Sequence, residues 1–284
     1  MQFDFPGTLA FGDGRYLARD RGQGGAERVL VIETLGAPRA PARRRRRPRS
    51  VDSGDPAPQL PLARATAVRA FEPFELEGEA AEWLDRAVAE DQADAVVAEG
   101  IDLLNRALHA HATSSADPHS QALRSERATS VRIGYGSGED VAAGQFAAAR
   151  EVDVWTIRAS RRRRREESLR PQERTAAVLV GREQIDACET LLLRARADLE
   201  AGRRREAALQ LRVGLEALLV ELRGAVADPA HDADMGTLQQ RAGEIGKAAN
   251  MALRGDLDAD TAESVSDLLE ICERVLRRRR VLRG

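Results

Sequence analysis

Residues 178–224 read VLVGREQIDACETLLLRARADLEAGRRREAALQLRVGLEALLVELRG, and this stretch decides how the second half of the chain folds. Its apolar residues recur at alternating spacings of three and four, which places them along one face of a helix. The first such series covers residues 178–199 and the second covers residues 208–222, with Gly202 between them. Because the connection is so short, we predict two antiparallel helices that pack side by side.

Two further apolar series lie downstream, at residues 238–252 and 262–276. Four amphipathic helices can bury their apolar faces against one another. We therefore predict an all-α antiparallel four-helix bundle over residues 170–284. In such a bundle the first helix begins at the same pole at which the fourth helix ends.

Local signals indicate how these helices begin and how closely they pack. Pro171 suits the first turn of the first helix, where its missing N–H is not needed. Asp260, with Glu263 three residues later, predicts a capping box at the start of the fourth helix. Gly243 and Gly246 lower the helix propensity of the third helix, and we interpret them as positions where a neighbouring backbone comes close.

The first hairpin has a family resemblance. Gly202, the pair Glu206-Ala207 and Gly214 stand where the middle of a tetratricopeptide repeat has a turn glycine, Glu-Ala and a small residue. Over about one helical hairpin the segment resembles that repeat, although Arg204 stands where the family has an aromatic residue. No second copy follows at the family's period of about 34 residues. The resemblance therefore implies a helical hairpin and neither a solenoid nor the family's peptide-binding groove.

Residues 1–158 have a different pattern and predict an α+β domain. Their strand-like segments are residues 8–11, 15–18, 29–32, 65–71, 129–135 and 152–157. The turn Gly12-Asp13-Gly14 is typical of a β-hairpin. Helical spacing at residues 79–90 and 94–111 predicts a helical hairpin. Together these patterns predict a mixed sheet of about six short strands with a helical hairpin on one face.

Two polar segments interrupt this organisation. Residues 37–61 carry six prolines, five consecutive arginines and few apolar residues, which predicts a disordered loop inside the first domain. Residues 159–169 are also rich in arginine, and we predict that they form a basic linker to the bundle.

Composition limits the classes of function. The 284 residues carry 44 Lys and Arg against 46 Asp and Glu, and the net charge of −2 excludes a globally basic nucleic-acid binder. Cys188 and Cys272 both fall on apolar series, which predicts buried free thiols and a reducing compartment. The chain shows no leader pattern and no long apolar run, so we expect a cytoplasmic protein with no membrane partner.

A glycine-rich turn follows the predicted strand at residues 129–135. Gly134, Gly136 and Gly138 could expose backbone amides to a phosphate, which would fit a nucleotide-handling enzyme at this loop. The spacing matches neither the dinucleotide-binding motif nor the P-loop, and Glu139 would repel a phosphate. The alternative is a turn in which Ser137 caps the next helix.

His109, His111 and His119, together with Asp117, have the side-chain chemistry that zinc binds. Positions two apart on a helix point about 200° from each other, so the first two histidines share an ion only if the helix end unwinds. The alternative is histidines near a helix C-terminus, where the helix dipole favours a cation. We expect no bound metal and no cofactor.

Arginines cluster in two tracts that the bundle topology brings to one pole. These candidate polyanion-binding residues are Arg161, Arg162, Arg163, Arg164, Arg165, Arg170, Arg277, Arg278, Arg279 and Arg280. Phosphate contacts are electrostatic, so such a pole could bind a nucleic acid or another polyanion. The loop between the second and third helices brings Asp228, Asp232 and Asp234 to the same pole, and a self-screened surface is the alternative.

These observations favour a non-catalytic cytoplasmic interaction protein that makes protein–protein contacts, or self-associates, through the helical bundle. Coiled-coil-like seams can extend between chains, which supports this expectation. The partner would be an unknown protein or a second copy of the chain. The alternatives are nucleic-acid or polyanion binding through the clustered arginines and a nucleotide-handling enzyme at the turn over residues 134–138. We expect no catalytic, cofactor-binding or metal-binding residues.

Overall fold

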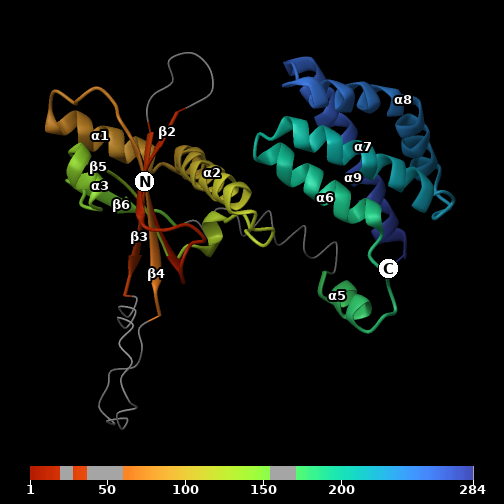
Figure 1. Cartoon of the computed structure of the whole chain (residues 1–284), viewed down its shortest axis with the longest axis horizontal. Coiled ribbons are helices and arrows are strands. Elements are labelled where there is room, and N and C mark those ends of the chain that lie inside the picture. Colours follow the sequence, from red (N-terminus) through yellow and green to blue (C-terminus); the bar gives the residue numbers. More distant parts are fainter. Residues whose placement is uncertain (20–27, 37–59, 154–170, 284) are drawn as a thin grey trace, which may run out of the picture. The chain divides into compact units, whose positions relative to one another are not determined.

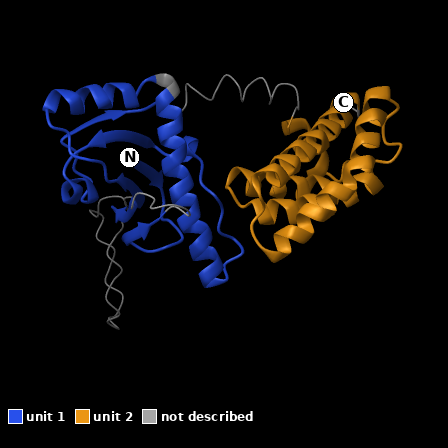
Figure 2. Ribbon diagram, turned by 90° about the horizontal axis from the view of Figure 1, so that it is seen from above, with its two compact units in different colours: residues 1–159 blue, residues 160–284 orange. Residues whose placement is uncertain are grey.

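The chain divides into two compact units, residues 1–159 and residues 160–284, in a computed structural model (Figure 1, Figure 2). The structure describes residues 1–19, 28–36, 60–153 and 171–283. The loop predicted over residues 37–61 falls outside these ranges except for its last two residues, and the linker predicted over residues 159–169 falls outside them entirely. Each unit has a hydrophobic core of its own.

Unit 1, residues 1–159, is built on a six-stranded sheet. Its strands are β1 (Gln2–Pro6), β2 (Gly14–Ala18), β3 (Arg28–Leu35), β4 (Leu62–Arg69), β5 (Ser130–Tyr135) and β6 (Ala148–Glu151). They lie in the order β2-β3-β4-β1-β5-β6 (Figure 1). The α+β class and the strand number predicted from the sequence are confirmed. Every neighbouring pair is antiparallel, however, so the sheet is not mixed.

The hairpin predicted over residues 8–18 does not form. Phe3 and Phe5 point to one face of β1, and this strand occupies a central place in the sheet. Gly7, with a φ of 91°, then turns the chain out of the strand, so residues 8–11 are not a strand. As a result β2 pairs with β3 at the sheet edge instead. At the other edge β6 ends at Glu151, and of the strand predicted at residues 152–157 only residues 152 and 153 are described, neither of them in a strand.

Helices cover one face of this sheet, as the sequence predicts. The helices that the structure describes in unit 1 are α1 (Glu77–Ala87), α2 (Glu90–Ser115), the 3-10 turn η1 (Ser125–Arg127) and α3 (Gly138–Ala142). Helices α1 and α2 cover the face that carries Phe3, whereas α3 lies toward the opposite face, where Glu139 pairs with Arg15. Residues at helical spacing are the buried ones, such as Leu84 in α1 and Leu104 in α2. They pack against Phe3 and Ile133 of the sheet in a single core. The position of this core follows from the 3.6-residue period of the helices.

The opposite face of the sheet carries a buried charge cluster centred on Asp4. Its carboxylate accepts two hydrogen bonds from Arg64, at 2.8 and 3.0 Å, and a third from Arg132 at 3.3 Å. Asp4 and Arg64 face each other because they are register partners across β1 and β4. The hydrogen bonds that Arg64 donates to Asp4 raise the pKa of Arg64. Two guanidinium groups therefore offset the cost of burying the Asp4 charge.

The described part of unit 2, residues 160–284, consists of helices and the turns that join them. Its helices are α5 (Pro171–Leu179), α6 (Ala187–Glu200), α7 (Arg204–Glu221), α8 (Pro229–Arg254) and α9 (Ala259–Arg283). Helices α6 to α9 form the predicted bundle: each packs on the next, and α9 closes against α6 and α7 (Figure 1). The apolar series are buried in it, and Leu192, Leu211, Ile245 and Leu269 are at most 2% exposed.

The first helix of the predicted bundle is broken into two. Gly181 has a φ of 74° and ends α5, a left-handed conformation that favours glycine. Helix α6 then begins with a capping box formed by Asp186 and Glu189. As a result Ile185, which the apolar series assigns to a buried face, is 60% exposed.

The glycines of α8 do not approach a neighbouring backbone, so that interpretation is wrong. A Cβ atom on Gly243 or Gly246 would meet no atom within 4 Å, because this side of α8 faces open space. The close approach occurs instead at Gly214 in α7, where a Cβ would lie 3.0 Å from Cδ2 of Leu192. Glycine is therefore required by close packing at position 214, but not at positions 243 and 246.

Helix α9 is capped two residues earlier than the sequence predicts. Oδ1 of Asp258 accepts a hydrogen bond from the backbone N–H of Thr261 at 2.8 Å. This bond is the largest cause of the lowered pKa of Asp258. Helix ends are the part of an element that sequence patterns locate least well, which accounts for the shift from Asp260.

Cys188 and Cys272 are free and buried in the core of unit 2. Burial raises the pKa of both thiols, that of Cys272 to about 12. Both thiols are therefore protonated near neutral pH and are not activated nucleophiles.

Candidate functional site

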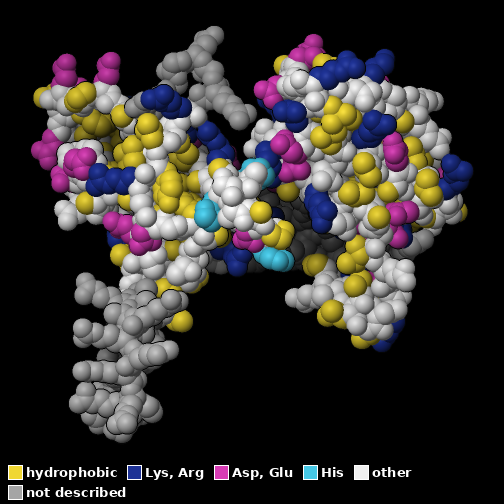
Figure 3. Space-filling model, in the orientation of Figure 1, with side chains coloured by type: hydrophobic (Ala, Val, Ile, Leu, Met, Phe, Trp, Pro, Cys, Tyr) yellow, Lys and Arg dark blue, Asp and Glu magenta, His cyan; other side chains and the backbone are white. Residues whose placement is uncertain are grey.

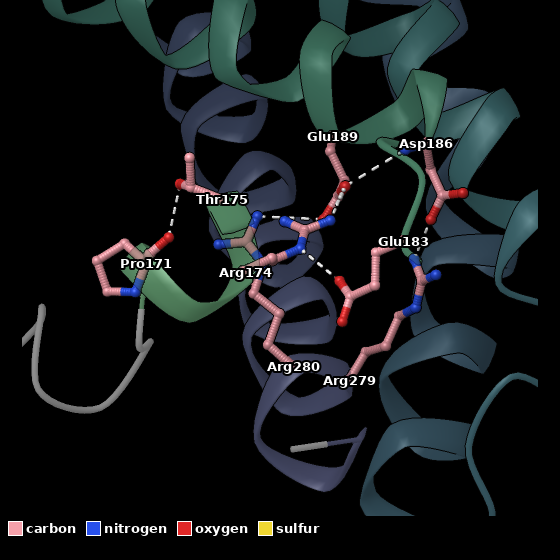
Figure 4. Close-up of polar contacts among 8 residues, drawn as sticks. All are labelled: Pro171, Arg174, Thr175, Glu183, Asp186, Glu189, Arg279 and Arg280. Carbon is pink, nitrogen blue, oxygen red and sulfur yellow. Dashed lines mark hydrogen bonds and ion pairs between the residues drawn. The ribbon is translucent and has the colours of Figure 1, made fainter. Parts of the chain in front are cut away.

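The arginine pole of unit 2 is the end of the bundle where α6 begins and α9 ends. Nη2 of Arg280 lies 3.1 Å from Oε1 of Glu189, and Arg279 is bound to Asp186 (Figure 4). Arg174 of α5 donates to the other oxygen of Glu189 at 2.6 Å. The predicted meeting of the first and last bundle helices is therefore present, and one carboxylate joins three helices.

Glu189 is 3% exposed at the centre of this pole. Desolvation by burial acts to raise its pKa, but the hydrogen bonds and charges of Arg174 and Arg280 outweigh desolvation, and the pKa is lowered. The carboxylate of Glu189 also accepts a hydrogen bond from the backbone N–H of Asp186 at 3.3 Å. Glu189 is thus a structural anion that its arginine partners keep ionised.

Most described arginines of this pole already have carboxylate partners. Arg278 lies 2.6 Å from Asp234 and 3.4 Å from Asp228, at the start of α8. Arg277 is exposed and makes no ion pair with a residue that the structure describes. Outside the described residues lie Arg161, Arg162, Arg163, Arg164, Arg165 and Arg170. Of the four candidate arginines at positions 277–280, three are paired with carboxylates of the chain. Polyanion binding by this pole therefore stays a prediction.

The glycine-rich turn after β5 is accounted for by packing. A Cβ on Gly134 would lie 2.6 Å from a carbonyl oxygen of β6, and one on Gly136 would lie 3.0 Å from a side chain of α3. Ser137 occupies the N-cap position of α3, as the sequence predicts, and its hydroxyl donates to Asp140. The two glycines therefore serve close contact between elements. The nucleotide-handling enzyme remains a prediction without support from their conformation.

Three histidines and Asp117 lie at the end of α2 and in the turn that follows it. His109 and His111 lie on α2, and the ring centroid of His111 is 5.9 Å from that of Phe11. The backbone N–H of His119 donates to Asp117 in a local turn at 2.9 Å. Within residues 1–19, 28–36, 60–153 and 171–283, no three His, Cys, Asp or Glu side chains are grouped so as to hold a metal ion.

Unit 1 contains a cleft of about 1040 Å³, which we call the aromatic cleft. One wall is residues 70–76, which connect β4 to α1, and another is the end of β5 with the turn that follows it. Helix α1, the first half of α2, the end of β4, Met1 and Arg28 complete the lining. Figure 3 shows apolar side chains in a hollow of unit 1 beside α1, with acidic side chains along its edge.

Four aromatic side chains from three parts of the chain meet in the aromatic cleft. Phe71 and Phe74 come from the connecting segment, Trp83 from α1 and Tyr135 from the end of β5. The Trp83 ring centroid lies 6.0 to 6.4 Å from those of the other three rings. Phe71 is 58% exposed and Phe74 is 40% exposed. Exposed rings gathered at a cleft are typical of a surface that a ligand or partner covers.

Charge is distributed unevenly around the aromatic cleft. Inside it, Glu99 lies 2.7 Å from Arg28 and 3.2 Å from Arg69, so these groups largely neutralise one another. The Arg69 guanidinium also lies 4.8 Å from the centroid of Phe71. The segment over residues 72–86 is acidic, with Glu72, Glu75, Glu77, Glu79, Glu82 and Asp85 against Arg86. Of these residues, Glu72, Glu77 and Arg86 line the cleft.

The sequence analysis does not identify this cleft, although one signal is present. Residues 71–85 read FEPFELEGEAAEWLD, in which three aromatic residues alternate with acidic ones. Aromatic residues make up only 4% of the chain, so their concentration here is informative. The fourth ring, Tyr135, joins the group only because β5 packs beside α1. No local pattern indicates that contact.

Comparisons with known protein families, with curated proteins and with solved structures gave no match. None of the described helices combines the length and the apolar character that crossing a lipid bilayer requires. The function of the chain must therefore be inferred from its own geometry and chemistry.

Proposed function

We propose that this chain is a non-catalytic interaction protein, and that it binds a segment of a partner protein in the aromatic cleft of unit 1. The observation that carries this proposal is the exposure of Phe71 and Phe74 at a cleft of about 1040 Å³. Burying a fully exposed phenylalanine contributes about 1.5–3 kcal/mol, so covering the exposed part of either ring contributes about half of that. Binding sites are typically lined by apolar and aromatic side chains with a few polar groups, as this cleft is.

The polar groups of the aromatic cleft favour binding over catalysis. Glu99, its most enclosed carboxylate, is held in place by ion pairs with Arg28 and Arg69, as expected of a group that orders the cleft. Tyr135 packs edge-on to Trp83 and Phe74 within the ring cluster. These side chains shape and order the cleft, which is the role expected of a recognition surface.

The bundle gives weaker support for an interaction surface. Its apolar seams are used within one chain, and Leu215 and Leu218 are 1% and 0% exposed. Such seam residues are not available to a second copy of the chain, so the exposed rings of unit 1 are the stronger candidate for an interaction surface. We also propose a cytoplasmic location, which the free buried thiols of Cys188 and Cys272 support.

A random-peptide display library panned against the purified full chain tests the proposed function. We expect peptides that bind the wild-type chain and fail to bind the double variant Phe71→Ala/Phe74→Ala. Phe71 is 58% exposed and Phe74 is 40% exposed, and neither belongs to the buried core, so their loss should leave the fold intact, which circular dichroism checks. The matched control is Leu193→Ala, which removes a 68% exposed side chain of α6 and should leave binding unchanged. Failure to enrich peptides, or equal binding to the double variant, would contradict the proposal.

A further inference from the structure

The rim of the aromatic cleft carries negative charge that the described part of the chain does not neutralise. Glu72 and Glu77 line the cleft, and neither makes a side-chain hydrogen bond or ion pair with any described residue. Glu75, Glu79 and Glu82 lie on the same segment outside the lining and make none either. Asp85 has a distant partner, since its carboxylate lies 3.8 Å from Arg150. Arg86 is the only basic residue on this stretch, over residues 71–87. The mouth of the cleft therefore favours a cationic occupant over an anionic one.

The aromatic rings of the cleft also favour a cationic occupant. The Arg69 guanidinium already lies over Phe71, within the distance of about 6 Å at which a ring face attracts a cation. Among the aromatic residues, tryptophan attracts cations most strongly, and Trp83 is at the centre of this cluster. Phe74 presents 40% of its surface to solvent beside it. A second cation can therefore be bound on the exposed side of the cluster.

Taken together, the rings and the rim define the chemistry of the partner. We propose that the partner segment carries an arginine or lysine side chain flanked by apolar residues. The basic group lies on the exposed rings and faces Glu72 or Glu77, which line the cleft, while the apolar neighbours enter it. Long basic side chains suit this position because their stems are apolar and their ends are charged. This inference names the partner class for the function proposed above and rests on it.

The inner part of the aromatic cleft explains why the cation is recognised at the mouth. There Glu99 already binds both Arg28 and Arg69 and has no free charge to offer. Nearby lining residues such as Leu103 and Ile133 are apolar and buried. The apolar residues of the partner therefore have a matching surface inside, and its basic residue has one outside.

Sequencing the peptides whose binding requires Phe71 and Phe74 tests this inference. We expect arginine or lysine to be enriched among them. A recovered peptide should bind about five- to tenfold more weakly when citrulline, a neutral isostere, replaces its arginine. Binding should also weaken at high salt, because the rim carboxylates are exposed and are screened by counterions.

The double variant Glu72→Gln/Glu77→Gln separates charge from shape. It should reduce the preference for arginine over citrulline by about threefold or more, and leave the affinity for the citrulline peptide unchanged. The matched control, Asp256→Asn/Glu263→Gln, removes two exposed carboxylates of unit 2 and should change neither affinity. Cleft-dependent peptides that are neutral or acidic, or that tolerate citrulline, would overturn the basic partner and leave the proposed function standing. A library that yields no cleft-dependent peptide would overturn both.

Discussion

Glu189 is a buried carboxylate whose charge is needed, because Arg174 and Arg280 both bind it. Replacing Glu189 by Gln should lower the free energy of unfolding of unit 2 by about 3 kcal/mol at neutral pH, since two partly buried guanidinium groups lose their partner. Chemical denaturation followed by far-UV circular dichroism measures this change.

The same residue predicts a dependence on pH. The pKa of Glu189 is lower in the folded chain than in the unfolded one. Its contribution to stability is therefore complete above the unfolded pKa of about 4.3, and it is lost as the pH falls through the lower folded value. The difference in unfolding free energy between wild type and Glu189→Gln should shrink below about pH 4. A difference that stays constant from neutral to acidic pH would show that the ion pairs are not its cause.

Two glycines of the bundle make a matched pair. Gly243→Ala on the open side of α8 should stabilise unit 2 by about 0.5–1 kcal/mol, because alanine has the higher helix propensity and restricts the unfolded chain. Gly214→Ala should destabilise it by about 1–3 kcal/mol, because the new Cβ would lie 3.0 Å from Leu192. The denaturant midpoints of the two variants, compared with that of the wild type, measure these changes. A gain in stability for both variants would contradict the tight α6–α7 contact.

At the scale of elements, α5 is the least embedded helix. None of its residues is buried, and Arg174 connects it to Glu183 at 3.2 Å and to Glu189 at 2.6 Å. Replacing Arg174 by Gln should therefore accelerate amide hydrogen exchange over residues 171–179 by about tenfold or more, while α6 to α9 keep their protection. Arg182→Gln, at an exposed position after α5, is the control and should leave exchange unchanged. Equal acceleration in both variants would mean that the ion pairs do not hold α5.

Periodicity in the sequence predicts elements well where burial alone sets the pattern. It identifies the buried positions of α2 and of the bundle, such as Leu104 and Leu211, because each lies on the one apolar face of its helix. It fails over residues 178–185, where the spacing continues but Gly181 adopts a left-handed conformation. The spacing of Asp186 and Glu189 is typical of a capping box and indicates that a new helix begins there.

The aromatic cleft could not be predicted in the same way. Its connecting segment has a distinctive composition, but the site exists only because Tyr135 and the turn after it are brought to α1 by the order of the strands. That order depends on β1, which displaces the expected hairpin at residues 8–18. Contacts across 50 or so residues have no local period, so neither composition nor spacing reveals them.

At the scale of the whole molecule, the two units have separate cores and should respond separately to mutation. Asp4→Ala should lower the unfolding free energy of unit 1 by about 3 kcal/mol, because Arg64 and Arg132 lose their carboxylate. Trp83 packs against the core of unit 1, so its fluorescence follows the unfolding of that unit, while the helical signal in circular dichroism is dominated by the longer helices of unit 2.

We expect Asp4→Ala to shift the fluorescence transition and to leave the unfolding of unit 2 in place. Glu82→Ala, at an exposed site on α1, is the control and should change stability by less than about 0.5 kcal/mol. One shared transition that moves as a whole would instead show that the units unfold together.

The central claim is that this chain binds its partner through unit 1 and not through the bundle. The most direct test is an NMR titration of the isotope-labelled full chain with a peptide recovered from the display library. We predict chemical-shift changes at the indole N–H of Trp83 and at the backbone amides of Phe71 and Gly136, with α6 to α9 unchanged. Shift changes confined to α6 to α9, with the Trp83 indole unmoved, would contradict the claim.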